Sequence, residues 1–292
     1  MRSLAWVLVG VLSAGAAAQG AIPAWATPEA EKIAESCRAA IRAEIAAGAA
    51  PDWAGEYYEG DGEGENVTLV LAPKAGFVVE NHGCLGLYGR NYGSVQVVDD
   101  RLKLGFTFGS ERKDWDLAPE LVPVRWGDRH YLLPADDIIG FCNEINGGRE
   151  PRDVVHGFYL LRRGDESVKV TGKPALPGDA MEALLPAPVE AIALAVGETT
   201  TEEGRSNTVF EYTHVTISAG SLHGLRVGMR FYIVEPKFGA FWATVEKVDE
   251  RTSEVVVLAM PQSGDPRPAA GWRFSTRLPG HPLPMEAVVP AR

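Results

Sequence analysis

The densest cluster of reactive side chains in the sequence is the stretch Glu80-Asn81-His82-Gly83-Cys84. A thiolate activated by a neighbouring histidine is the basis of cysteine-nucleophile enzymes. His82 and Cys84 are two positions apart, so on a strand their side chains share one face. The sequence supplies no identifiable third catalytic member and no oxyanion hole. A hydrolase using these two residues is therefore only the second alternative for the function, and a non-catalytic protein is preferred.

A second group of polar and aromatic side chains surrounds the turn predicted at Gly127-Asp128. Arginine and aromatic side chains can grip a carboxylate or stack on a sugar ring. A hairpin with an ordinary aromatic cross-strand pair explains the same pattern, and we prefer that interpretation. The candidate ligand-binding residues are Arg125, Trp126, His130 and Tyr131.

Carboxylates alternate with glycines in the loop Asp61-Gly62-Glu63-Gly64-Glu65. Hard cations such as Ca²⁺ need several converging oxygens, and a glycine-rich loop can wrap to supply them, so Asp61, Glu63 and Glu65 are candidate metal ligands. The last ligand position of an EF-hand loop would fall on Ala72, which excludes that motif. A solvated hairpin tip is the preferred interpretation. No helical histidine pair and no Cys-x-x-Cys motif are present, and no cofactor is expected.

The N-terminal segment predicts export. Arg2 precedes the apolar run Leu4–Leu12, and the small residues Ala16-Ala17-Ala18 follow it. A cation, a short hydrophobic core and an A-x-A site are typical of a secretory signal peptide, here residues 1–18. The apolar run is too short for a stable membrane anchor. We therefore expect a secreted or periplasmic protein, with an uncleaved helix as the alternative.

Three cysteines are present, Cys37, Cys84 and Cys142. In an oxidising compartment two of them are expected to pair. The preferred disulfide joins Cys84 to Cys142, because both lie within the main predicted domain. The alternative joins Cys37 to Cys142. The remaining cysteine is expected to be buried, as a small hydrophobic residue would be.

The overall charge limits the classes of partner. The chain carries a formal net charge of −11 at pH 7. A strongly negative protein is soluble and is repelled by nucleic acid and by anionic membranes. No segment after the signal peptide is long and apolar enough for a transmembrane helix. We expect no nucleic-acid partner and no integral membrane segment after signal cleavage.

The predicted elements divide the chain into two domains. Thr27-Pro28-Glu29 can open a helix that Gly48 ends, and a second short helix is expected over Ala135–Ile145. Short apolar runs cut by glycines over Trp53–Phe108 and later hairpins predict an antiparallel β-meander or barrel. Residues 27–172 are therefore expected to form an α+β domain dominated by this sheet.

The second predicted domain is all-β. The segment 173–188 is rich in proline and is predicted to be a linker. The clean alternation of apolar residues over Leu225–Ile233 predicts a strand, and further strands suggest a small barrel of five or six strands over 189–278. The tail, 279–292, contains further prolines and is expected to be loose.

Four strings between Trp53 and Pro177 resemble those of a family of secreted bacterial proteins: Trp-Ala-Gly-Glu-Tyr-Tyr, Leu-Ala-Pro-Lys-Ala-Gly-Phe, His-Gly-Cys-Leu-Gly-Leu-Tyr and Pro-Val-Arg-Trp-Gly-Asp-Arg-His-Tyr-Leu. That family has no assigned function, so this resemblance implies no chemistry. A second resemblance covers Leu222 to Leu258. The pattern of Gly224 to Met229, followed by Phe231 and Ile233, is similar to small β-barrel modules appended to bacterial envelope proteins, which implies a role in assembly or interaction.

Three functions of different classes follow. The preferred one is a non-catalytic envelope or interaction protein, with the second barrel as adaptor and a protein or small molecule as partner. The first alternative is a lipocalin-like carrier of a small ligand, in which Tyr58, Leu69 and Phe77 line a void inside the meander. The second alternative is the hydrolase using Cys84 and His82.

Overall fold

The structure is a computed structural model that describes residues 22–60, 64, 66–109, 117–151, 159–170, 172–203, 209–237, 242–261, 264 and 266–280. The expected signal peptide and the metal candidates Asp61, Glu63 and Glu65 lie outside the described residues. Most of the regular structure is β-strand, as predicted. No helix in these ranges combines the length and apolar character needed to cross a membrane.

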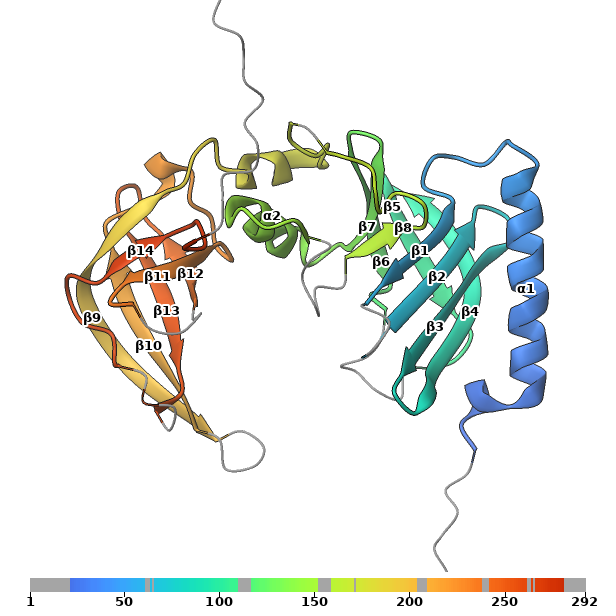
Figure 1. Ribbon diagram of the computed structural model, residues 1–292, viewed down its shortest axis with the longest axis horizontal. Helices are drawn as coiled ribbons and strands as arrows, with labels where there is room; N and C mark the ends of the chain where they lie inside the picture. Colours follow the sequence, from blue (N-terminus) through green and yellow to red (C-terminus); the bar gives the residue numbers. More distant parts are fainter. Residues whose placement is uncertain are drawn as a thin grey trace, which may run out of the picture.

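Eight antiparallel strands close into a barrel, named here the first barrel (Figure 1). Each strand pairs with the next along the chain, and the short last strand closes the ring by pairing with the first. The sequence predicted an antiparallel meander or barrel, and a closed barrel is confirmed. The strands are β1 (Gly55–Glu59), β2 (Asn66–Ala72), β3 (Gly76–Gly83), β4 (Gly86–Val98), β5 (Arg101–Phe106), β6 (Glu120–Trp126), β7 (Arg129–Pro134) and β8 (Leu160–Arg162).

Aliphatic and aromatic side chains gather in one cluster inside the first barrel, because alternate residues of a strand point to opposite faces. Leu69 and Phe77 are fully buried in this cluster, as the carrier hypothesis expected of inward positions. Tyr58 is different, because it packs against a separate cluster on the outside, while its neighbour Tyr57 points inward. Buried members from all eight strands pack together: Tyr57, Val67, Leu69, Leu71, Phe77, Val79, Val95, Leu102, Leu104, Leu121, Leu132 and Leu160.

Helix α1 (Pro28–Ala46) covers the outer face of β2, β3 and β4 (Figure 1). It begins as the sequence predicts: the Thr27 side chain accepts a hydrogen bond from the Ala30 N–H, and Pro28 takes the first turn, where no backbone donor is needed. The short helix η1 (Ala24–Ala26) precedes it. Ala34 and Ile41 are fully buried against Val70 and Val78 of the sheet. An apolar stripe on the helix thus meets the apolar outer face of the barrel.

Six further strands form a second closed barrel in the order β10-β13-β12-β11-β14-β9. Strands β10 and β13 alternate buried and partly exposed residues, which places one face in the barrel interior. The short helix η5 (Ser221–His223) lies between β10 and β11 along the chain. The strands are β9 (Glu190–Glu203), β10 (Val209–Ile217), β11 (Arg230–Glu235), β12 (Trp242–Val248), β13 (Ser253–Ala259) and β14 (Arg273–Ser275).

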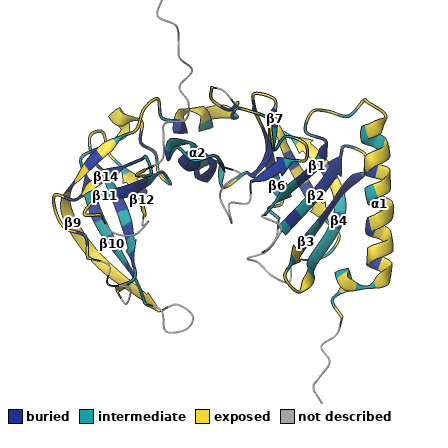
Figure 2. Cartoon of the chain, in the orientation of Figure 1, coloured by how far each residue is buried: buried dark blue, intermediate teal, exposed yellow. Residues whose placement is uncertain are grey.

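Helix α2 (Ile138–Asn146) lies between the two barrels and is mostly buried (Figure 2). One hydrophobic cluster runs from Tyr131 of the first barrel through Phe141 of the helix to Phe231 of the second. Polar contacts also join α2 to the second barrel. The Asn143 side chain donates to Gly228 O at 2.9 Å and accepts from the Arg230 N–H at 3.0 Å. Whether residues 27–172 and 189–278 behave as separate domains stays a prediction.

The proline-rich segment 173–188, expected to be a linker, is packed along α2. It contains η3 (Gly178–Ala183), and Leu176, Ala183 and Leu184 are buried. Asn146 donates to Ala183 O at 2.9 Å and accepts from the Leu185 N–H at 3.0 Å. These two hydrogen bonds satisfy the main-chain oxygen of Ala183 and the main-chain N–H of Leu185, which belong to neither barrel. The segment connects the two barrels and also forms part of the layer between them.

Candidate functional site

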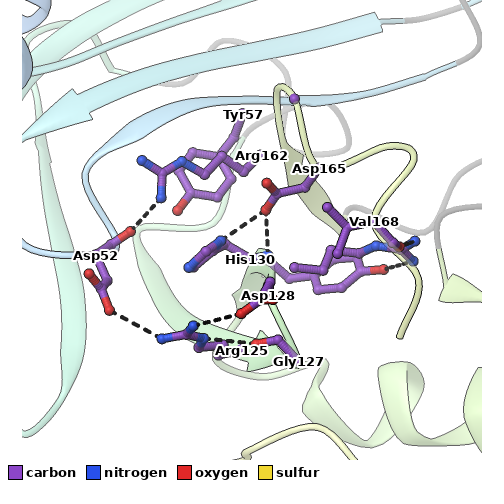
Figure 3. A network of polar contacts seen from close by, with 12 residues as sticks. Asp52, Tyr57, Arg125, Gly127, Asp128, His130, Arg162, Asp165 and Val168 are labelled. Carbon is purple, nitrogen blue, oxygen red and sulfur yellow. Dashed lines mark hydrogen bonds and ion pairs between the residues drawn. The ribbon is translucent and has the colours of Figure 1, made fainter. Parts of the chain in front are cut away.

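Strand β7 and the loop after β8 bring His130 and Asp165 together at one end of the first barrel (Figure 3). The Nδ1 atom of His130 lies 2.9 Å from Oδ2 of Asp165, and the His130 N–H donates to the same oxygen at 2.7 Å. Both side chains are largely buried, with exposed fractions of 18% and 15%. One carboxylate oxygen therefore fixes both the ring and the main chain of His130.

Two arginines, one on β6 and one on β8, lie around the same end of the barrel. Arg125 on β6 pairs with His130 across the strands, and its Nη2 donates to Asp128 at 3.0 Å. Its Nε donates to Gly127 O at 2.8 Å, and Nη1 lies 3.6 Å from an oxygen of Asp52. Arg162 at the end of β8 donates to the main-chain oxygens of Asp52 and Ala54 at 3.0 and 3.1 Å. Figure 3 shows how these side chains join three loops.

A buried tyrosine and a buried arginine complete the polar end of the barrel. The Tyr57 hydroxyl donates to Trp53 O at 3.0 Å, and burial raises its pKa well above the ordinary tyrosine range. Arg129, which is 2% exposed, contacts Glu150, the Tyr131 hydroxyl and Val168 O. Because Tyr57 and each of the three arginines donate to at least one main-chain oxygen, the network connects loops to one another.

The four predicted ligand-binding residues divide between the two faces of the β6–β7 hairpin. Arg125 and His130 face the polar end just described. Trp126 and Tyr131 are 6% and 0% exposed and belong to the hydrophobic cluster that continues into α2. The Trp126 indole donates to Gly172 O at 3.0 Å, which satisfies its only polar atom. The structure therefore brings two of the four candidates together and places the other two in the core. The expected hairpin is present, but Trp126 pairs with Arg129 and Tyr131 with Val124, so neither has an aromatic partner directly across the strands.

His82 and Cys84 lie at the exposed tip of the β3–β4 hairpin. Gly83 pairs with Gly86, so Cys84 and Leu85 form the turn itself, and β4 begins only at Gly86. Leu85 beside the thiol is 92% exposed. A cysteine nucleophile acts where a base and an oxyanion hole are held around it, and an exposed hairpin tip does not favour that arrangement.

The expected disulfide between Cys84 and Cys142 is absent, and so is the alternative with Cys37. The sequence placed both cysteines in one predicted domain, but it did not show which atoms surround each thiol. Cys84 is exposed on a turn, whereas Cys142 is fully buried in α2 with its Sγ 3.9 Å from Ala180 O. Desolvation raises the pKa of the Cys142 thiol to about 12. A thiolate is the reactive form, so this burial makes Cys142 inert.

We expect a thiol reagent to distinguish these cysteines. In the native protein at neutral pH, iodoacetamide should alkylate Cys84, because its side chain is exposed to solvent. Cys142 should react only after unfolding, since it is buried and protonated. Peptide mass spectrometry before and after denaturation measures both sites. Isolation of a peptide pair linked through Cys84 and Cys142 would contradict the structure.

Strand β9 contributes a long sheet edge that the sequence did not reveal. It pairs with β10 as far as Glu203, but with β14 only over Glu190, Ala191 and Ile192. Two further main-chain hydrogen bonds join Ala193 to Trp272 and Gly271. From Leu194 onward, no second neighbouring strand is found among the described residues. Unpaired backbone donors and acceptors along such an edge can accept another strand.

The outer face of β9 is apolar in its first half and polar in its second. Ile192, Leu194 and Val196 are 48%, 53% and 41% exposed, whereas Ala191 and Ala193 are buried and Ala195 is exposed. Beyond Gly197 the strand is exposed on both faces and carries Glu198, Glu202 and Glu203 (Figure 2). The sequence contained one sign of this strand, since alanines alternate with larger aliphatic residues over 191–196. The threonine and glutamate run that follows gave no apolar alternation.

The chain was compared with protein-family models, with curated proteins and with solved structures, and none of them matches. The two resemblances drawn from short strings of the sequence therefore stay predictions.

Proposed function

We propose that the protein is an exported, non-catalytic adaptor that binds an extended segment of a partner protein along the edge of β9. The edge from Leu194 to Glu203 carries this proposal, because among the described residues only β10 pairs with it, and an added strand would satisfy its remaining main-chain groups. Export rests on the signal-peptide pattern of residues 1–18. The division into an α+β part and an all-β adaptor part belongs to the same proposal.

The surface chemistry of β9 defines the partner. The apolar stripe Ile192, Leu194 and Val196 can contact alternate apolar side chains of an added strand. Glu198, Glu202 and Glu203 favour basic residues further along. The net charge of −11 opposes association with a second copy and favours a cationic partner. The proposed partner is therefore an extended segment with apolar and basic residues.

The remaining geometry agrees with binding better than with the alternatives. A carrier needs an internal void, but the interior of the first barrel holds a cluster of buried side chains, and its end is tied by the polar network. An enzyme using His82 and Cys84 would work from an exposed hairpin tip. The residues on which the carrier and the enzyme hypotheses depend therefore support neither of them.

A charge placed in the apolar stripe tests the proposal. A short fluorescein-labelled peptide that alternates valine with lysine serves as the probe, and fluorescence anisotropy measures its binding to the full chain. Leu194→Lys should weaken binding about tenfold or more, because lysine on an edge opposes strand addition and repels a basic partner. The side chain is 53% exposed, so the fold should tolerate the change.

The matched control is Leu222→Lys, which makes the same charge change on η5 at a side chain that is 64% exposed. It should leave peptide binding unchanged. A failure of the unmodified protein to bind the peptide would refute the proposal, and so would an equal loss in both variants.

A further inference from the structure

Three adjacent strands of the second barrel bring metal-ligating side chains together on its outer face. His214 lies on β10, Glu254 on β13 and Glu246 on β12, and β13 pairs with both of the other strands. Nδ1 of His214 lies 3.0 Å from Oε1 of Glu254 and 3.8 Å from Oε2 of Glu246. One donor atom from each residue lies within 4.8 Å of the others. None of these residues belongs to the β9 edge.

The pairing of the three strands and one irregularity of β12 create this convergence. His214 belongs to an unbroken register between β10 and β13, in which Thr216, two residues further along β10, pairs with Glu254. The β12–β13 pairing shifts between Val245 and Lys247, and Glu246 is the residue left over there. A β-bulge inserts an extra residue and turns its side chain away from the regular alternation.

The irregularity pairs Lys247 with Glu254, an ordinary cross-strand charge pair, and leaves Glu246 beside them as the extra residue of β12. Glu246 and Glu254 lie on the same face as His214, so two carboxylates flank one imidazole. Two carboxylates at this separation repel one another unless a cation lies between them or the histidine carries a proton.

The distances fit a first-row divalent metal. Zn²⁺ binds imidazole nitrogen and carboxylate oxygen at about 2.0–2.2 Å, which places tetrahedral ligand atoms roughly 3.4 Å apart. The separations of 3.0 and 3.8 Å from Nδ1 lie on either side of that value. The side chains are 34%, 52% and 44% exposed, so a metal can enter from solvent and keep a water ligand.

We propose that His214, Glu246 and Glu254 form a binding site for one Zn²⁺-type divalent cation on the outer face of the second barrel. Nitrogen and carboxylate donors together suit first-row transition metals, whereas Ca²⁺ prefers six or more oxygens. The ion joins strands β10, β13 and β12 and neutralises the two carboxylates. This site is independent of peptide binding at β9.

Zinc titration of the full chain, prepared without a histidine tag and stripped with a chelator, tests the site. Isothermal calorimetry with Zn²⁺ alone should show one equivalent bound at micromolar concentration or tighter. His214→Ala and Glu246→Gln should each weaken that binding at least tenfold, since losing even an outer-shell partner typically costs about 10–100-fold. Glu250→Gln, at an exposed turn of the same barrel, is the matched charge control and should bind normally.

Cobalt gives a second readout that does not depend on affinity. Co²⁺ in the site should produce visible d–d absorption that His214→Ala abolishes and Glu250→Gln retains. Far-ultraviolet circular dichroism of each variant shows that the barrel is folded. Folded protein that binds no Zn²⁺, or folded His214→Ala and Glu246→Gln variants that bind it as tightly as the unmodified chain, would overturn the proposal.

Discussion

Gly93→Ala is expected to destabilise the first barrel by about 3 kcal/mol or more, because the added methyl group has no room. A Cβ atom at this position of β4 would lie 1.8 Å from the main-chain oxygen of Gly105 and 3.2 Å from the ring of Phe77. The closest atom belongs to the backbone, so the strands themselves must move. The residue pairs with Phe77 on one side and Phe106 on the other, and those two rings meet edge to face at 5.2 Å.

The same strand supplies the control. Gly89→Ala adds a methyl group where no atom lies within 4 Å of the new Cβ, so stability should change by only about 0.5 kcal/mol. Urea denaturation followed by circular dichroism measures both variants against the unmodified protein. Equal midpoints for the two variants would show that the backbone at position 93 can relax, and that β4 is not held as closely to β5 as the structure requires.

The local rules of the sequence predicted the elements whose signals are short in range. The cap at Thr27 and the proline at position 28 placed the start of α1. Alternating and apolar runs placed most strands of the first barrel. Closure of that barrel was left open, because it depends on β8, a strand of three residues that pairs with both β1 and β7. A pairing between distant short strands leaves no periodic signal in either of them.

The candidate site shows the same limit. Period-two alternation separates Arg125 and His130 from Trp126 and Tyr131, and this signal in the sequence could have divided the four residues between two faces. Asp165, which fixes His130, follows a short strand and could not be assigned by pattern. The disulfide prediction was wrong because cysteine count and compartment do not reveal which thiols are brought close.

Bulges and long polar strands were beyond prediction for a related reason. The strand at β10 was missed, and the one expected over Leu225–Ile233 begins only at Arg230, after a turn at Gly228 with φ of +85°. His214, Glu246 and Glu254 are far apart in sequence and meet because β13 pairs with both β10 and β12, with Glu246 at a register shift of β12. Register shifts arise from the packing of several strands, which one segment does not encode.

The second large effect is expected at Glu144, because its buried carboxylate forms an ion pair between α2 and the second barrel. The side chain is 1% exposed, and its two oxygens lie 3.1 Å from Nη1 of Arg230 and 2.5 Å from Nη2 of Arg149. Glu144→Ala should destabilise the protein by about 3–5 kcal/mol, since breaking a buried ion pair leaves its partner charges without compensation. Thermal denaturation measured by circular dichroism gives the change.

A surface ion pair between the same layers is the matched comparison. Arg226 of the second barrel contacts Asp179 and Glu182 of η3, whose side chains are 87% and 68% exposed. Arg226→Ala should cost only about 0–1 kcal/mol, because solvent screens an exposed pair. Both substitutions remove charge contacts between the second barrel and the layer beside it, so burial is the main difference between them. If the two variants lose similar stability, the carboxylate of Glu144 is hydrated in solution, and the hydrophobic cluster alone joins α2 to the second barrel.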